Sequence, residues 1–408
     1  MTTTLDIQGT CEPRFSAVRD AFADNFIRGR EVGASVSITL DGVTVVDLWA
    51  GSADEAGSRP WTQDTLVNVY SCTKGLGAIC AHMLVDRGKL DLDTPVATYW
   101  PEFAQAGKAS LPVRYLLSHR AGLPALTRTL PPETLYDWDA MCAALAVQAP
   151  WWKPGSAHGY HALTYAWLVG EVVRRVDGRS IGTFFRQEVA QPLGLDAHIG
   201  CGPELDARIA DLLPSPPPPP GQVDLLAEMM ADKESMSAKA FGNPPVLGRT
   251  TVNSRAWRAA EICSANGHAN ARALARFYAA LGAWTRGETF AGVRLMTQQG
   301  MEQARTEQSA GMDQVLRLEN RIALGFMLPS PMRRFSANPR AFGHAGAGGS
   351  LGFTDPEHRL SFGYAMNQMQ SGGPGGDGRW WGLIQGMYDA IGVPFMPPGS
   401  DGRGTSVG

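Results

Sequence analysis

The sequence contains few lysines and no excess of positive charge. Only six of its 36 basic residues are lysine, and 39 acidic residues leave a formal net charge of −3. This balance provides no basic face to hold a phosphate backbone, so we expect no nucleic-acid partner. Because lysine is scarce, each lysine position carries more information about function than it would in a lysine-rich chain.

Cysteine is also sparse and unpatterned. The six cysteines lie at positions 11, 72, 80, 142, 201 and 263, without the paired spacing of a metal site or the density of a disulfide-rich domain. The sequence has no His-Glu-x-x-His run either. We therefore expect reduced thiols and neither a metal ion nor another cofactor.

Long apolar runs are absent as well. No stretch approaches the roughly 18 apolar residues that a membrane-spanning helix needs, and residues 1–6 lack the basic and apolar segments of a secretory signal. With 44% hydrophobic and 18% charged residues, the composition is that of an ordinary globular protein. We expect a cytoplasmic, soluble protein that acts on a small molecule and has no membrane partner. The sequence gives no indication of oligomeric state.

Hydrophobic periodicity and turn signals divide the chain into strand-rich ends and a helical middle. Asp41-Gly42 is a strong two-residue hairpin signal between two strand-like runs. The predicted helices are 13–28, 74–86, 136–148, 165–176, 270–283 and 379–391, and the predicted strands are 34–40, 43–50, 341–345, 350–354 and 360–366.

This order predicts a mixed α/β (α+β) protein whose two chain ends build one sheet domain, residues 1–70 and 260–408. Residues 71–259 form a mainly helical domain between them. The proline run at 214–220 cannot pair in a sheet, and we expect residues 202–256 to form a long surface excursion.

The strongest chemical signal is Ser71 followed three residues later by Lys74. At this spacing both side chains lie on one face of a helix, which places a nucleophile beside a proton acceptor. A helix N-terminus also favours the oxyanion that forms when a serine attacks a carbonyl. The alternative is an N-capping serine with an exposed lysine, although only one of the six lysines follows a serine at this spacing.

Three segments carry a resemblance to a known family: Asp64 to Gly75, Leu116 to Pro124 and Pro154 to Tyr160. In their order and spacing they resemble class C β-lactamases, penicillin-binding proteins and especially family VIII carboxylesterases, over residues 15–200 and 260–390. The resemblance implies a β-lactamase/transpeptidase-like fold, in which an antiparallel sheet flanked by helices joins an all-helical domain. It also implies serine-hydrolase activity.

The resemblance assigns a catalytic role to Tyr160. In this family a tyrosine lies on a loop of the helical region, and two residues later comes an asparagine or a substitute, which is Ala162 here. A tyrosine that shares a proton with a lysine can take the serine proton and return it to the leaving group. Ala162 lacks the amide that orients substrates in β-lactamases. A buried core tyrosine is the alternative.

The third family element is usually Lys-Thr-Gly, and His344-Ala345-Gly346 takes its place in this sequence. Histidine lacks the permanent charge that would hold a β-lactam carboxylate. By resemblance, the N–H groups of Ala347 and Ser71 would form the oxyanion hole, and His344, Gly346 and Ala347 would bind substrate. A purely structural hydrogen bond is the alternative role of His344.

Two other motifs match functional patterns in the wrong context. The run from Gly348 to Gly352 matches Gly-x-Ser-x-Gly around Ser350, but a strand-like run follows where a nucleophile elbow needs a helix. The run from Gly373 to Gly378 matches Gly-x-Gly-x-x-Gly, but no βαβ pattern surrounds it. We expect a structural serine and an ordinary turn.

Together these residues predict a serine carboxylesterase that hydrolyses short-chain acyl esters through an acyl-serine intermediate. Ser71 is the predicted nucleophile, and Lys74 and Tyr160 move its proton. The enzymatic alternatives are a β-lactamase, a D-alanyl peptidase and an acyltransferase. A non-catalytic sensor that traps an acyl compound is a further alternative, which the joint presence of the three residues disfavours.

Overall fold

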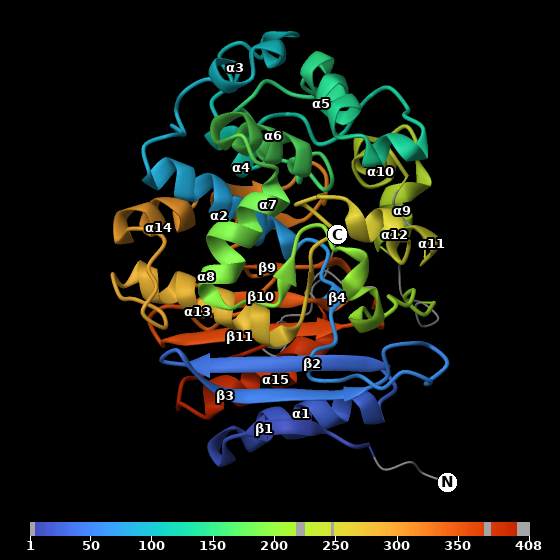
Figure 1. Ribbon diagram of the computed structural model, residues 1–408, viewed down its shortest axis with the longest axis vertical. Coiled ribbons are helices and arrows are strands. Elements are labelled where there is room, and N and C mark those ends of the chain that lie inside the picture. The colour runs from blue at the N-terminus through green and yellow to red at the C-terminus, as the bar shows by residue number, and fades with distance from the viewer. Residues whose placement is uncertain (1–4, 218–224, 246–248, 371–376, 398–408) are drawn as a thin grey trace.

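The computed structural model describes residues 5–217, 225–245, 249–370 and 377–397. No helix within these ranges is long and apolar enough to cross a membrane. All six cysteines lie in the described part and are unpaired. Figure 1 shows a sheet layer with helices on both faces and a helical region beyond one edge of the sheet.

The main sheet has six antiparallel strands in the order β1-β3-β2-β11-β10-β9. Its strands are β1 (Gln8–Cys11), β2 (Gly33–Leu40), β3 (Val43–Gly51), β9 (Phe342–Ala345), β10 (Leu351–Asp355) and β11 (Leu360–Met366). The pairing of β2 with β11 joins the two chain ends. All five predicted strands are therefore confirmed, while the short edge strand β1 was not predicted because four mostly exposed residues give no alternating pattern.

The hairpin between β2 and β3 turns at the predicted dipeptide. Asp41 and Gly42 have φ angles of 53° and 80°, and two residues with positive φ are what a tight hairpin turn of this kind requires. Strand β11 depends on a glycine for its contact with a helix. A Cβ on Gly363, in the middle of β11, would collide with the backbone of α13 (Ala271–Thr285). This glycine lets α13 pack closely on the sheet.

Helices cover both faces of the sheet. Figure 1 shows α1 (Ser16–Ile27) and α15 (Gly378–Asp389) against one face and α13 against the other. Buried side chains of α1 and α15, Phe22 and Leu383 among them, share a core cluster with apolar residues of β2, β3, β10 and β11. These three helices confirm the predictions at 13–28, 270–283 and 379–391.

The chain between the two halves of the sheet is mainly helical. The predicted helices at 74–86, 136–148 and 165–176 are α2 (Thr73–Asp86), α5 (Trp138–Val147) and α6 (Tyr165–Asp177). The remaining helices are α3 (Val96–Tyr99), α4 (Arg114–Leu117), α7 (Ile181–Phe185), α8 (Gln191–Leu193), α9 (Leu225–Ala231), α10 (Met236–Gly242), α11 (Arg249–Val252), α12 (Arg255–Ala259) and α14 (Gln298–Arg305). Short strands form two small sheets: β4 (Val67–Asn68) and β5 (Ala197–His198) flank β6 (His268–Ala269), and β7 (Ser309–Met312) pairs with β8 (Glu319–Ile322).

The segment 202–256, predicted as a surface excursion, contains short helices and several buried residues that the sequence did not predict. The short helices α9, α10 and α11 lie there, α12 begins at its end, and Ile209, Ala238 and Val252 are buried. The side chain of Asn243 donates to two carbonyls and accepts the N–H of Leu130, which fastens the segment to the helical region. Helices this short produce no extended periodicity in the sequence. Residues 218–220 of the proline run lie outside the described residues.

Candidate active site

Ser71 lies in a tight turn that leads from β4 into α2. Tyr70, the residue before it, has a φ angle of 42°, a left-handed conformation that costs a non-glycine residue backbone strain. The turn is closed by the N–H of Thr73, which donates to the carbonyl oxygen of Tyr70 at 2.9 Å. Ser71 therefore precedes the first residue of α2 by two positions, and its side chain remains partly exposed at the helix N-terminus.

Lys74 is buried directly behind Ser71. Its Nζ lies 3.3 Å from the Oγ of Ser71 and donates to the carbonyl oxygens of Ala162 and Ser264, both at 2.8 Å. Burial of the amine lowers the pKa of Lys74 to about 7, because a charged ammonium loses its hydration there. The alternative of an exposed lysine beside a capping serine is excluded by its complete burial.

Tyr160 comes from the loop that precedes α6, and its ring packs against the same amine. The Nζ of Lys74 is 4.6 Å from the centroid of the Tyr160 ring. A hydrogen bond with Ser71 lowers the pKa of Tyr160, but burial outweighs it and raises the pKa well above the usual value. The phenol is therefore protonated at neutral pH, and it contacts both other members of the predicted catalytic group.

The end of β9 closes the site against the Ser71 turn. The Sγ of Cys72 donates to the carbonyl oxygen of His344 at 3.1 Å. A side chain at Gly346 would collide with the carbonyl oxygen of Val69, so only glycine permits this approach. Ala347 follows as the first residue of an exposed turn at the rim. The predicted substrate-binding residues thus lie beside the predicted nucleophile.

The imidazole of His344 is neutral. Burial and the nearby charge of Lys74 lower the pKa of His344 to about 3. Its Nδ1 lies 2.7 Å from the carbonyl oxygen of Ala345, and since a carbonyl can only accept, Nδ1 carries the proton and Nε2 is an acceptor. Burial lowers the pKa of His161 to about 3, and it lowers the pKa of His119 well below its usual value. Of these residues, Lys74 is the one whose protonation changes near neutral pH.

Comparison with known proteins shows the family of this chain. The sequence model of the β-lactamase family matches residues 18–385. The chain belongs to the β-lactamase family. A curated family relative, the esterase/β-lactamase LipL of Mycobacterium tuberculosis, is 36% identical over 367 residues, which cover 89% of this chain and 83% of LipL.

Solved structures of similar proteins confirm the β-lactamase/transpeptidase-like fold. The crystal structure of a family VIII carboxylesterase matches with a TM-score of 0.85 and 42% identity, covering 94% of this chain and 100% of that chain. A penicillin-binding protein homologue from Caulobacter crescentus matches with a TM-score of 0.85 and 41% identity, again covering 94% and 100%. The resemblance drawn from the three sequence segments is therefore confirmed.

Ser350 has none of the features of a nucleophile. Its side chain is completely buried, and its Oγ has no hydrogen-bond partner in the part of the chain that the structure describes. Strand β10 begins at the next residue, so the helix that a nucleophile elbow requires is absent at this position. Residues 373–376 of the other misleading motif lie outside the described ranges, while its last two residues are described: Asp377 caps α15 and Gly378 is the first residue of that helix.

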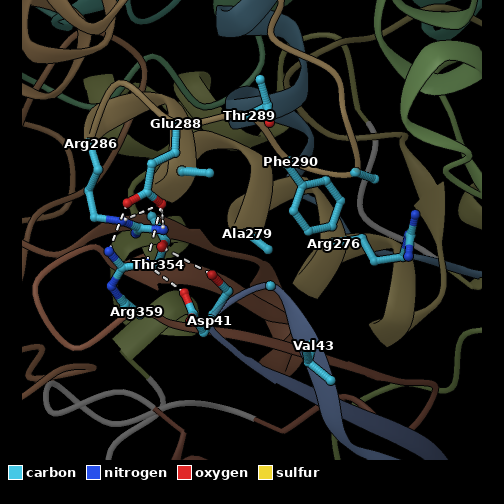
Figure 2. Close-up of a pocket in the computed structure, with 14 residues that line it drawn as sticks. Asp41, Val43, Arg276, Ala279, Arg286, Glu288, Thr289, Phe290, Thr354 and Arg359 are labelled. Carbon is cyan, nitrogen blue, oxygen red and sulfur yellow. Dashed lines mark hydrogen bonds and ion pairs between the residues drawn. The ribbon is translucent and has the colours of Figure 1, made fainter.

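A cavity of about 310 Å³ lies at the hairpin between β2 and β3, and Figure 2 shows the side chains around it. Four of its charged side chains are paired with one another: Arg359 binds Asp41 and Glu288, and Arg286 binds the other oxygen of Glu288. None of the residues around Ser71 lines it. It contributes no group to the site formed by α2, β9 and the Tyr160 loop.

Sequence reasoning missed two residues that contact the Tyr160 loop, His119 and Asp313. The carboxylate of Asp313 accepts the backbone N–H of Tyr160 at 3.0 Å, and the Nδ1 of His119 accepts the N–H of His161 at 3.1 Å. His119 belongs to the segment Leu116–Pro124, which carried part of the family resemblance and received no role. No pattern in the sequence singles out Asp313, because its contact joins residues 153 positions apart.

Proposed function

We propose that this protein is a serine carboxylesterase that works through an acyl-serine on Ser71. The observation that carries the proposal is the buried Lys74 amine, held between the Ser71 hydroxyl and the Tyr160 ring. The names of LipL and of the family VIII carboxylesterase agree with an esterase. A β-lactamase is the second candidate, since LipL carries both descriptions.

Lys74 is the base that we propose for the first step. A neutral amine has two N–H groups, which the carbonyls of Ala162 and Ser264 accept, so its lone pair is left for the hydroxyl proton of Ser71. Once protonated, the ammonium lies over the faces of the Tyr160 and Tyr165 rings, 4.6 Å and 5.7 Å from their centroids. Such contacts stabilise a desolvated cation.

Tyr160 acts in this scheme as a protonated relay rather than as a phenolate. Its raised pKa disfavours the anion, while its hydrogen bond with Ser71 places the phenol where a proton must pass. As Ser71 attacks the ester carbonyl, its proton moves to Lys74, and the leaving alkoxide takes a proton through Tyr160. The backbone N–H groups of Ser71 and Ala347 are the proposed donors to the oxyanion.

Water completes the cycle at the same groups. It attacks the acyl carbonyl of the acyl-serine and gives up a proton to Lys74. The tetrahedral intermediate then collapses to release a carboxylic acid, and Lys74 returns the proton to the departing Ser71 oxygen. His344, Gly346 and Ala347 are the proposed substrate contacts, and the neutral His344 offers an acceptor at Nε2 and no positive charge. We propose small, short-chain acyl esters as substrates.

The compartment is part of the same proposal. Five of the six unpaired cysteines are buried, and free thiols of this kind are typical of a reducing compartment. We propose that the enzyme acts in the cytoplasm on a small-molecule ester.

We expect ester hydrolysis to be faster than β-lactam hydrolysis. A β-lactam carboxylate would find a neutral His344 in place of a charged lysine and thereby lose a charge-assisted hydrogen bond of about 1.5–3 kcal/mol. That difference corresponds to about a tenfold to hundredfold lower kcat/KM. The measurement is kcat/KM for p-nitrophenyl butyrate and for nitrocefin, with mass spectrometry of the acyl adduct on Ser71. An equal or higher value for nitrocefin would favour the β-lactamase.

We expect kcat/KM for esters to rise with pH through a single ionisation near pH 7. Lys74 must be neutral to accept a proton, so activity is lost as the pH falls through the lowered pKa of its amine. The titratable groups around this amine are Cys72, His119, Tyr160, His161, Tyr165, Cys263 and His344. A pH-stat assay between pH 5 and pH 9 measures the profile.

The variant His344→Asn provides the control for this profile. Since the pKa of His344 is lowered to about 3, its removal leaves the ionisation near pH 7 in place, whatever it does to the absolute rate. A profile that becomes flat in His344→Asn would assign the ionisation to the histidine and contradict the role of Lys74.

A further inference from the structure

The loop that carries Tyr160 is held by three consecutive backbone hydrogen bonds. The N–H of Gly159 donates to the carbonyl oxygen of His119 at 3.1 Å, and the N–H of Tyr160 donates to the Oδ1 of Asp313 at 3.0 Å. The N–H of His161 donates to the Nδ1 of His119 at 3.1 Å. His119 and Asp313, both remote in sequence, therefore fix the backbone conformation of the loop that carries the Tyr160 side chain.

Asp313 belongs to the connection between β7 and β8 and is completely buried. Its Oδ1 accepts three backbone N–H groups, from Tyr160, Val315 and Leu316, at 2.8–3.0 Å. The next residue, Gln314, donates its N–H to the carbonyl oxygen of His158 at 3.0 Å. The carboxylate thus shapes its own turn and at the same time ties that turn to the Tyr160 loop.

His119 supplies the second attachment from the segment after α4. It has a φ angle of 59°, and its ring centroid lies 4.9 Å from that of Tyr160. Burial lowers the pKa of His119 well below its usual value, so the ring is neutral and Nδ1 remains an acceptor at neutral pH. His161 is fixed in turn, because its Nε2 accepts the N–H of Leu123 at 3.1 Å.

We propose that Asp313 and His119 are positioning residues that set the hydroxyl of Tyr160 against Ser71. The inference rests on the proposed function, because it gives Tyr160 a part in proton transfer. Neither side chain is required to touch the substrate. Since a misplacement of about 1 Å in a reacting group can cost about a hundredfold in rate, loosening either attachment slows acylation while leaving ester binding largely intact.

The first test compares a variant that keeps the acceptor atom with one that removes it. Asp313→Asn retains an oxygen for the three N–H groups, and its new amide takes the place of Oδ2, which has no partner among the described residues. Asp313→Leu keeps the approximate shape and removes the acceptor. We expect kcat to fall by about tenfold to a hundredfold in Asp313→Leu with little change in KM, and Asp313→Asn to retain most of the rate.

His119 permits the same comparison. His119→Asn offers an amide oxygen close to the position of Nδ1, and asparagine tolerates the left-handed φ angle. His119→Phe keeps a ring and loses the acceptor. We expect His119→Asn to recover most of the kcat that His119→Phe loses.

The second test distinguishes positioning from general stability. In a Tyr160→Phe background there is no hydroxyl to position, so adding Asp313→Leu should lower kcat little further. The rate of Ser71→Ala is subtracted as the background rate of both variants. Asp355→Asn is the matched control, because Asp355 is another completely buried carboxylate that accepts backbone N–H groups, from Glu357 and His358. We expect it to leave kcat unchanged.

If Asp313→Leu lowers kcat by the same factor with and without the Tyr160 hydroxyl, the positioning role is overturned. A wild-type kcat in both Asp313→Leu and His119→Phe would also overturn it. A wild-type protein without Ser71-dependent ester hydrolysis would instead overturn the proposed function. The two failures are therefore distinguishable.

Discussion

Ser71→Ala lowers the rate of ester hydrolysis by on the order of a thousandfold or more, while the protein stays folded. The hydroxyl oxygen is the atom that we propose to attack the carbonyl, and Lys74, 3.3 Å away, is the group that we propose to take its proton. The substitution removes one partly exposed atom from a turn whose backbone bonds stay intact. The measurement is kcat/KM for p-nitrophenyl butyrate, with circular dichroism and the thermal midpoint as tests of folding.

Ser350→Ala is the matched control for this prediction. Ser350 is the serine of the Gly-x-Ser-x-Gly run, and its buried Oγ makes no hydrogen bond among the described residues, so its removal leaves no partner unsatisfied. We expect activity close to that of the wild type and an acyl adduct on Ser71 by mass spectrometry. Loss of the adduct in Ser350→Ala with normal turnover in Ser71→Ala would reverse the assignment of the nucleophile.

Tyr160→Phe lowers the rate of acylation by roughly 10²–10⁴, the range typical of one general acid–base group. The ring that packs over Lys74 remains in this variant, so the change removes the relay for the proton and leaves the contact with the amine. The loss should be larger for esters of poor leaving groups, which need protonation, than for p-nitrophenyl esters. Pre-steady-state acylation rates across a series of leaving groups measure this difference.

The stability of Tyr160→Phe separates catalysis from packing. Because only a hydroxyl is removed and its partner Ser71 is partly exposed, we expect the thermal midpoint to stay close to that of the wild type. A variant that is folded and acylates at a near-normal rate for every leaving group would give Tyr160 a structural role only. Lys74 would then remain as the sole proton carrier among the three residues.

Much of the fold could be predicted because its signals are local. Asp41-Gly42 encodes a tight turn by itself, and the flanking strands are read from apolar residues a few positions apart. The short helices within 202–256 were not predicted for the opposite reason, since the segment is held by long-range contacts such as those of Asn243 with carbonyls more than a hundred positions away. The edge strand β1 was not predicted, because its pairing with β3 makes it a strand and its own sequence pattern does not.

The sequence by itself determined the family resemblance and the candidates Ser71, Lys74 and Tyr160, because these depend on residue type and spacing along the chain. The tertiary structure alone decided their charge states. Lys74 changes its protonation near pH 7, and Tyr160 stays protonated there, because segments far apart in sequence exclude water from both. It alone also brought Asp313 and His119 to the Tyr160 loop, since hydrogen bonds between remote residues form only when the chain is packed.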